Sequence, residues 1–247
     1  MNAISAFLPK RRAAILLYHS VDKNDVYLTV KPEIFEKQMH YLKVKNYQVI
    51  SLEELAKILH NNKKIHPKTI ILTFYDGFLS HYEKVFPILK KYNFPATFFI
   101  STGLVGGSMD NSQRLPQPTM TWEQITEMSR SPLIDIEPHG INHRELDGLS
   151  LAEVEHEIVE SKNEIEMRLN KKCHFFAPPR GKYSKAVTNL IKKYNFDAIA
   201  IIEEGLIKAS DDLFILRRNT INSSCANQVQ FLARLNWSVA LFNLIKF

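Results

Sequence analysis

The sequence predicts an α/β fold built on a parallel sheet, and three of its features lead to that prediction. Short apolar runs rich in β-branched and aromatic residues recur along the chain, and segments with the apolar spacing of helices separate them. A length of 247 residues with 45% hydrophobic and 23% charged residues suffices for one large core, so a single domain accounts for the chain. Strands that alternate with helices predict right-handed crossovers and one parallel sheet, either open or closed into a barrel.

Eight apolar runs have the length and composition of buried parallel strands. They cover residues 13–18, 48–51, 69–74, 96–101, 133–136, 174–177, 198–202 and 213–216. Such runs are apolar on both faces because helices cover both sides of a parallel sheet. Seven or eight strand-helix units fit a chain of this length.

Recognisable start signals mark the helices between these runs. Pro32 opens one helical pattern, and Ser51 precedes an acid three residues on, which is a capping signature. Residues 121–124 repeat that capping pattern. Ser150 begins the longest predicted helix, residues 151–169, whose apolar side chains fall mostly on one face.

The least regular stretch of the chain is residues 103–120, with two adjacent glycines and two prolines near its end. Glycine and proline in this density mark turns. The sequence therefore predicts a long loop over one end of the sheet, and long loops inside compact domains often carry function.

Charge and cysteine content argue against several classes of protein. The net charge of +6 is spread along the chain and does not indicate nucleic acid binding. Cys173 and Cys225 lie far apart and outside any Cys-x-x-Cys pattern, which indicates two buried thiols and neither a disulfide framework nor a cysteine zinc site. The basic residues 10–12 precede an apolar run too short for a signal peptide, and no run reaches the roughly 20 residues of a spanning helix. We expect a soluble, cytoplasmic protein.

A histidine pair and an aspartate follow predicted strands. His139 and His143 are four residues apart, a spacing that lets both imidazoles face one point but is a weak signal alone. Asp76 strengthens it, because the carboxyl ends of parallel strands meet at the same face. Two imidazoles and one carboxylate are a common ligand set for a catalytic divalent metal with open positions.

His19 ends a strand in the same way, after the apolar residues 15–18. Hydrolysis at a metal needs a base to take a proton from water and an acid to give one to the leaving group. A histidine with a pKa near neutral suits the acid role, and the alternative is a capping or core histidine.

Ordered motifs over most of the chain resemble one known family. These are Thr-Phe-Tyr-Asp-Gly at 73–77, His-Gly-Ile-Asn-His at 139–143 and Phe-Ala-Pro-Pro-Arg-Gly-Lys-Tyr at 176–183. They resemble the polysaccharide deacetylases of the NodB-homology type, carbohydrate esterase family 4. The Leu-Tyr-His element at 17–19 comes first, as in the permuted branch that contains the poly-N-acetylglucosamine deacetylases of biofilm formation. The resemblance runs from about residue 15 to residue 221.

The resemblance implies a distorted (β/α) barrel, with a NodB-like deacetylase domain over residues 13–222. Such a domain hydrolyses N-acetyl groups of amino sugars with a divalent metal, commonly zinc. Asp76, His139 and His143 correspond to the metal ligands, and His19 corresponds to the general acid. The implied partner is an acetylated amino-sugar glycan, either a surface polysaccharide or a lipid-linked glycan.

Tyr75 departs from the family motif Thr-Phe-Asp-Asp-Gly, in which the first aspartate is the general base. A tyrosine with its ordinary pKa of about 10 is protonated at neutral pH and mainly donates hydrogen bonds. Loss of a general base typically costs about 10²–10⁴ in rate. Three functions therefore stay open: an impaired deacetylase, a catalytically inactive carbohydrate-binding or scaffolding homologue, and a metal hydrolase with another substrate.

Glu137 is a candidate replacement for the missing base. In extended backbone Glu137 and His139 point to the same side, so Glu137 could serve as base or as an additional metal ligand. The alternative is a carboxylate paired with a neighbouring lysine or arginine.

The third motif and a later arginine complete the predicted site. Pro179, Arg180 and Gly181 are expected to form a wall of the substrate groove, where Arg180 would contact an anionic group or simply face solvent. Arg218 corresponds to a family arginine that orients the base carboxylate. With Tyr75 in the base position, that carboxylate is missing.

Residues 223–247 are predicted to form an apolar helical segment. A helix with so many large apolar side chains either packs against the domain or lies at a membrane interface. The second arrangement would suit a lipid-linked substrate at the inner face of a membrane, where Arg234 and Lys246 would meet anionic headgroups.

Overall fold

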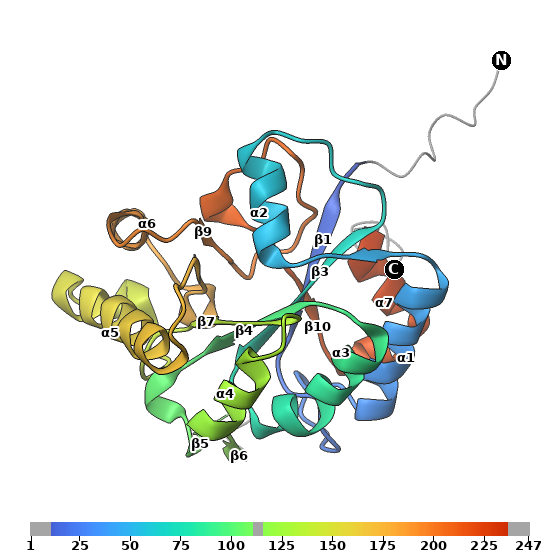
Figure 1. Cartoon of the computed structure of the whole chain (residues 1–247), viewed down its shortest axis with the longest axis horizontal. Coiled ribbons are helices and arrows are strands. Elements are labelled where there is room, and N and C mark those ends of the chain that lie inside the picture. Colours follow the sequence, from blue (N-terminus) through green and yellow to red (C-terminus); the bar gives the residue numbers. More distant parts are fainter. Residues whose placement is uncertain (1–10, 111–115, 237–247) are drawn as a thin grey trace, which may run out of the picture.

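The core of the protein is a parallel sheet with helices packed around it (Figure 1). The computed structural model describes residues 11–110 and 116–236. The sheet comprises β1 (Ala13–Tyr18), β2 (Gln48–Val49), β3 (Thr69–Asp76), β4 (Ala96–Ile100), β7 (Ile134–Pro138) and β10 (Asn219–Ile221). Its strands follow the order β10-β1-β3-β4-β7, and β2 pairs with β3 beside this path. All of these strands pair in parallel, as the alternation of strands and helices predicts.

Two further strands continue the curve of the sheet. β8 (Phe175–Phe176) and β9 (Ala198–Ile199) form a separate parallel pair. The Ala177 N–H donates to the Pro138 carbonyl at 3.3 Å, next to the end of β7, and Ala200 forms a parallel bridge with Leu216, shortly before β10. The strands therefore follow the arc of a distorted barrel, and the predicted single α/β domain is confirmed.

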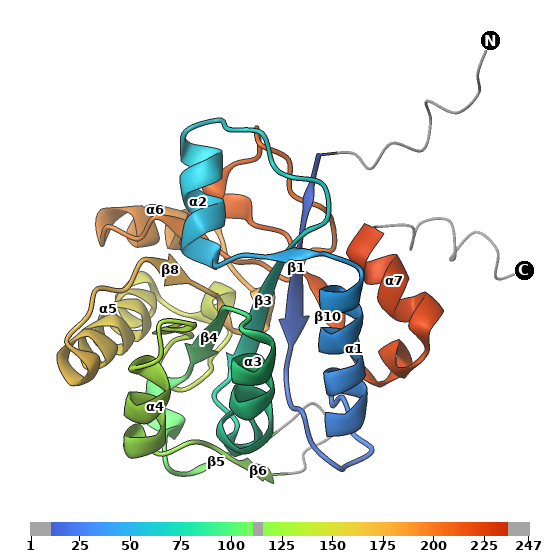
Figure 2. The ribbon, with the colours of Figure 1, turned by 45° about the vertical axis from the view of Figure 1, so that its right-hand side comes forward.

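The helices surround this arc (Figure 2). They are α1 (Pro32–Val44), α2 (Leu52–His60), α3 (Phe86–Tyr92), α4 (Trp122–Ser129), α5 (Leu151–Leu169), α6 (Lys185–Lys193) and α7 (Gln228–Asn236). Helix α2 lies at the end of the arc where β1 and β3 begin, and the others lie along its outside. The predicted starts are confirmed, since the Ser51 side chain accepts the Glu54 N–H and capping boxes form at Thr121 and Ser150. Within the described residues, no helix combines the length and hydropathy needed to cross a membrane.

Alternate residues of the strands serve two separate clusters of apolar side chains. On β1, Leu16 and Tyr18 belong to the outer cluster, which the surrounding helices complete, whereas Ile15 and Leu17 belong to the inner one. Tyr75 at the end of β3 also belongs to the inner cluster. Its side chain therefore points into the barrel.

Two sequence predictions about secondary structure need correction. The predicted strand at 213–216 is a single helical turn, Leu213–Ile215, whose start is capped by the Asp212 side chain, and the strand follows at β10. The predicted loop at 103–120 contains a hairpin of β5 (Ser108–Asp110) and β6 (Pro116–Pro118). Other short helical turns are His81–Val85, Thr102–Leu104, Leu146–Gly148, Pro179–Gly181 and Ser223–Ala226.

The described part of the predicted C-terminal segment packs against the domain. Phe231 and Leu235 of α7 are buried in the outer cluster, and α7 contacts β1 and β10. Residues 237–247, with the rest of the predicted apolar segment, lie outside the described residues.

Candidate active site

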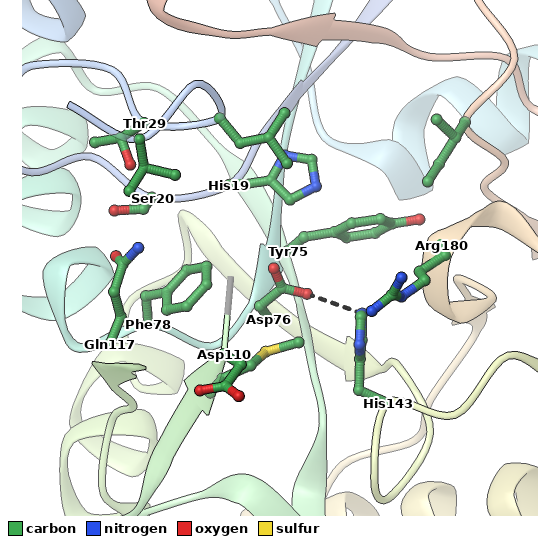
Figure 3. Close-up of a pocket in the computed structure, with 14 residues that line it drawn as sticks. His19, Ser20, Thr29, Tyr75, Asp76, Phe78, Asp110, Gln117, His143 and Arg180 are labelled. Atoms are coloured by element: carbon green, nitrogen blue, oxygen red, sulfur yellow. Dashed lines mark ion pairs between the residues drawn. The ribbon is translucent and has the colours of Figure 1, made fainter. Parts of the chain in front are cut away.

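The predicted ligand set converges at the carboxyl ends of two strands. Asp76 ends β3, and His139 and His143 follow β7. The Asp76 Oδ1 atom lies 3.5 Å from His139 Nε2 and 3.4 Å from His143 Nε2. The three ligand atoms all lie within 4.8 Å of one another. Figure 3 shows Asp76 and His143 facing each other in the pocket.

Unusual backbone conformations aim these side chains. Asp76 has a φ of 77° and the following Gly77 a φ of 78°, so two successive left-handed residues turn the chain sharply after β3. His143 has a φ of 54°. Side-chain-bearing residues adopt this region at a cost, and such strain gathers at functional sites.

The hydrogen bonding of His139 leaves the cluster open to a cation. Because a carbonyl only accepts, the His139 Nδ1–H donates to the Ala177 carbonyl at 2.6 Å, and the Nε2 lone pair faces Asp76. Among the described residues, neither Asp76 Oδ1 nor His139 Nε2 has a hydrogen-bond partner, although both atoms are buried. Two buried acceptors that face each other without a proton donor fit a divalent metal ion.

Burial sets the protonation states of these groups. It lowers the pKa of His143 to about 4, helped by the positive charge of Arg180, and lowers the pKa of His139 well below its usual range. Burial also raises the pKa of Asp76 to about 7, against the opposing effect of Arg180. Both imidazoles are therefore neutral at neutral pH, the form that binds metal.

Glu157, which the sequence did not single out, holds the loop that carries both histidines. Its side chain comes from α5 and is 2% exposed, and its Oε2 atom accepts the N–H groups of Ile141 at 2.6 Å and Asn142 at 3.1 Å. Gly140, with a φ of 78°, passes so close that a Cβ there would lie 3.0 Å from the same oxygen. A glutamate among apolar helix positions gives no sequence signal for this role.

His19 stands at the end of β1 beside Tyr75, with ring centres 5.6 Å apart and the rings perpendicular. Its Nδ1 atom is buried and has no partner among the described residues. Burial lowers the pKa of His19 to about 3, and the charge of Arg218 contributes. His19 is therefore a neutral imidazole at neutral pH.

Tyr75 and Arg218 meet inside the barrel. Tyr75 is 1% exposed and lies against His139, with ring centres 4.1 Å apart. The Arg218 guanidinium lies 4.3 Å from the centre of the Tyr75 ring and donates to its hydroxyl. It also donates to the carbonyls of Ile201 at 2.8 Å and Ala200 at 2.9 Å.

No carboxylate pairs with Arg218 in the part of the chain that the structure describes, and its Nη1 atom has no partner there. Burial lowers its pKa well below the usual range. An arginine with its charge held only by carbonyl oxygens, a tyrosine hydroxyl and an aromatic ring lacks the anion that such a cation normally meets.

Glu137 lies elsewhere, which corrects the hypothesis that it replaces the base or adds a ligand. Its carboxylate accepts the N–H groups of His174 and Phe175, each at 3.1 Å, and pairs with Lys171 at 3.5 Å. It is not part of the metal-ligand cluster. The alternation of sides holds, because Glu137 pairs in register with Phe99 of the inner cluster and His139 packs against Tyr75 of the same cluster. Glu137 stands two residues earlier in the chain, however, where β8 and Lys171 bind its carboxylate.

Of the three predicted groove residues, Arg180 lines the pocket, whereas Pro179 and Gly181 are not among its lining residues. Pro179, Arg180 and Gly181 make a short turn in which Arg180 has a φ of 53°. Arg180 lines the pocket next to His143 (Figure 3), and its Nη1 atom lies 3.4 Å from Oε1 of Glu145. Both side chains are largely exposed, so this pair is weak.

The pocket joins these residues in one cavity of about 140 Å³, lined by His19, Tyr75, Asp76, His143 and Arg180. Its opposite end is lined by residues that the sequence reasoning missed, among them Ser20, Thr29, Phe78 and Gln117. They come from loops and from the β5-β6 hairpin, where no regular sequence pattern marks a binding residue.

Comparison with known proteins gives the same assignment as the motifs. The family model described as polysaccharide deacetylase matches residues 62–199. The Bacillus subtilis (strain 168) protein YxkH is 29% identical over 204 residues, which cover 83% of this chain and 69% of that protein.

Two relatives are named poly-beta-1,6-N-acetyl-D-glucosamine N-deacetylase. The Escherichia coli (strain K12) protein is 23% identical, with 82% of this chain and 35% of that protein covered. The Staphylococcus aureus (strain MSSA476) protein is 27% identical, with 78% of this chain and 64% of that protein covered. The chain thus spans about a third of the length of the Escherichia coli protein and just under two thirds of the length of the Staphylococcus aureus protein.

Solved structures share the fold. The Streptococcus pyogenes deacetylase PplD, in complex with acetate, is 28% identical with a TM-score of 0.76, covering 89% of this chain and 97% of that chain. IcaB from Ammonifex degensii is 22% identical with a TM-score of 0.81, and the match covers 91% of this chain and 97% of that chain. At this identity, the match to IcaB is evidence for a shared fold only. The family match, the motifs and the arrangement of Asp76, His139 and His143 lead to one conclusion: the chain belongs to the polysaccharide deacetylase family.

Proposed function

We propose that this protein is a metal-dependent hydrolase that removes N-acetyl groups from an amino sugar of a surface polysaccharide or lipid-linked glycan. The observation that carries the proposal is the cluster of Asp76, His139 and His143 beside the pocket. In it Asp76 Oδ1 and His139 Nε2 face each other, buried and without a hydrogen-bond partner among the described residues. Zinc is the proposed ion, because two neutral imidazoles and one carboxylate suit it. When bound, the metal would polarise the acetyl carbonyl and make water more acidic.

His19 is the proposed proton carrier. Since burial keeps its imidazole neutral, it has no proton to give at the start. It first takes a proton from the attacking water while the new carbon–oxygen bond forms, and it then gives that proton to the leaving nitrogen while the carbon–nitrogen bond breaks. The products are acetate and a free amino sugar.

Tyr75 is proposed to lower the rate. In the base position it presents a hydroxyl that already accepts a hydrogen bond from Arg218, and it adds no carboxylate to take the water proton. One imidazole must then serve both proton transfers. We expect turnover below that of a site with an aspartate in this position.

The predicted cytoplasmic location and the membrane contact of the C-terminal segment rest on the sequence alone and stay predictions. Residues 237–247, which carry much of that segment's apolar character, lie outside the described residues.

The second candidate function is a catalytically inactive carbohydrate-binding or scaffolding protein. The Tyr75–Arg218 pair favours it, because both side chains fill the barrel interior where a base carboxylate would otherwise meet the arginine. The ligand atoms of Asp76, His139 and His143 are grouped with the tyrosine in place. Binding without turnover is therefore the alternative outcome.

Acetate release from N-acetylglucosamine oligomers separates the two candidates. The oligomers are incubated with the zinc-loaded protein and with its Tyr75→Asp and Tyr75→Phe variants, and metal content is measured in parallel. We expect slow release by the unaltered protein and an increase of about 10²–10⁴ in Tyr75→Asp, which regains a proton acceptor beside Arg218.

Tyr75→Phe is the matched control, because it keeps the ring and removes only the hydroxyl. We expect its rate to stay near that of the unaltered protein. No release by the unaltered protein together with a strong gain in Tyr75→Asp would favour the inactive homologue. No release by any of the three at full metal occupancy would overturn the deacetylase proposal.

A further inference from the structure

One end of the active-site pocket is lined by three uncharged polar side chains, Ser20, Thr29 and Gln117. Ser20 and Thr29 are each 2% exposed and Gln117 is 8% exposed. All three line the same cavity as the metal-ligand cluster. Figure 3 shows them together on one side of Asp76, with Arg180 on the other side.

The polar atoms of this corner lack partners within the protein. Ser20 Oγ, Thr29 Oγ1 and Gln117 Nε2 are buried, and the described residues offer none of them a hydrogen bond. An unsatisfied buried donor or acceptor costs roughly 1–3 kcal/mol. Three such atoms, on residues that line one cavity, are candidates for hydrogen bonds with a ligand, which reaches them when these side chains turn toward the cavity.

The corner is built by fixed backbone. Ser20 and Thr29 directly precede Val21 and Val30, which form a parallel β-bridge. The Val30 N–H also donates to the Ser20 carbonyl at 3.0 Å. Gln117 lies on β6, opposite Met109 of β5. The three side chains therefore come from paired segments, which hold the backbone of this corner in place.

The chemistry of the corner selects a neutral ligand with several hydroxyl groups. The two hydroxyls each donate and accept, and the amide nitrogen of Gln117 donates. Phe78, which is 2% exposed, lies between this corner and Asp76 in Figure 3 and gives an apolar surface beside the polar groups. Hydroxyls above an apolar face describe one side of a sugar ring, whereas an anion would find its cation only at Arg180, on the far side of Asp76.

We infer that Ser20, Thr29 and Gln117 bind the ring hydroxyls of the sugar unit that carries the scissile acetamide, and that they determine which sugar is accepted. Ser20, Thr29 and Gln117 line the same cavity of about 140 Å³ as Asp76 and His143, so we assign the corner and the metal-ligand cluster to the same sugar unit. The inference rests on the proposed deacetylase function and adds to it the recognition of the hydroxyl groups.

The test pairs changes in the protein with changes in the sugar. Affinities for methyl N-acetyl-β-glucosaminide, and for analogues that each lack one ring hydroxyl, are measured by NMR titration with the unaltered protein, Thr29→Val and Gln117→Met. Each variant keeps the side-chain size and removes the hydrogen-bonding group. We expect each to bind the complete sugar about 3- to 10-fold more weakly, the value of one neutral hydrogen bond.

The deoxy analogues give the sharper readout. At least one of them should bind the unaltered protein more weakly than the complete sugar does, and Thr29→Val or Gln117→Met should abolish that difference, because the two changes remove the same hydrogen bond. Thr97→Val is the matched control. Its hydroxyl is also buried and without a partner among the described residues, but it does not line the pocket, and we expect unchanged affinity.

Each result decides the matter. If the unaltered protein binds the sugar and both variants bind it equally well, with the same ranking of the deoxy analogues, the inference is overturned while the proposed function stands. If neither the unaltered protein nor Tyr75→Asp binds or deacetylates any acetylated sugar, the proposed function falls and takes the inference with it. Melting temperatures check folding, and Ser20→Ala replaces any variant that does not fold.

Discussion

Asp76 and Tyr75 are neighbours in the chain, yet they belong to two regions with opposite physical character. Asp76 faces the pocket, where its Oδ1 atom and the Nε2 atom of His139 lie buried without donors. Tyr75 also lines the pocket, but its hydroxyl reaches into the barrel interior, where aromatic rings and the Arg218 side chain surround it. The first region is incomplete without a cation, whereas the second is filled by its own side chains.

The groups that would bind the metal and the groups around the base position lie on two separate sides of the site. The ligand side keeps its acceptors, its fixed histidine tautomer and its strained backbone. The base side has exchanged a carboxylate for a ring, and Arg218 remains there with carbonyl oxygens as partners. We therefore propose that the protein keeps its metal site while Tyr75 lowers its turnover.

Removal of the ligand carboxylate is expected to have the largest effect on metal binding. Asp76→Ala leaves two imidazoles, and we expect its zinc affinity to fall by about 10³ or more, since metal affinity depends on the number and charge of the ligands. Competition with a zinc-sensitive dye measures it. Asp110→Ala is the control, because Asp110 also lines the pocket but lies outside the cluster. Equal losses in both variants would contradict the assigned ligand set.

A change at Glu137 is expected to affect stability and not metal binding, because its carboxylate pairs within the structure and lies outside the ligand cluster. In Glu137→Leu, the N–H groups of His174 and Phe175 and the Lys171 charge lose their partner. We expect the free energy of unfolding to fall by about 2–3 kcal/mol, measured by urea titration. Zinc affinity should stay unchanged in the folded protein. A stable variant that no longer binds zinc would restore the idea that Glu137 is a ligand.

Glu157 tests how far the ligand side depends on its support. Glu157→Gln loses the charge that holds the N–H groups of Ile141 and Asn142, and we expect zinc affinity to fall roughly 10- to 100-fold, as for other groups that orient ligands. The exposed Glu160→Gln on the same helix is the control. If zinc binding were the same in both variants, the loop would need no anchoring from α5.

The smallest expected effect concerns acid stability at His81, which lies under the pocket. Burial lowers its pKa from 6.5 to about 4, so the unfolded chain binds a proton there that the folded protein does not. Between pH 7.5 and 5.5 this costs about 1 kcal/mol of stability, because stability falls as pH drops below 6.5 and levels off below the folded pKa. His81→Gln should remove that part of the decline in urea titrations of the metal-free protein. An unchanged slope would show that His81 takes up protons equally in both states.

The sequence predicted those parts of the site that regular patterns mark. Asp76, His139 and His143 could be grouped because parallel strands end at one edge, and the helix starts at Ser51, Thr121 and Ser150 carried local capping signals. Glu137 was misplaced because strand alternation gives the side that a side chain faces but not the depth at which it finds its partners. Ser20, Thr29, Gln117 and Glu157 were missed, because loops and a buried polar helix position follow no period that could reveal them.

The sequence by itself determined the family, the α/β class and the order of the ligand motifs, since apolar periodicity, capping and short motifs are local properties. Only the tertiary structure decided which polar groups share a cavity and which are already paired. It showed Glu137 bound to β8 and Lys171, and Arg218 bound to carbonyls and Tyr75. The physical reason is that hydrogen bonding and burial depend on contacts between residues far apart in the chain, which no local pattern records.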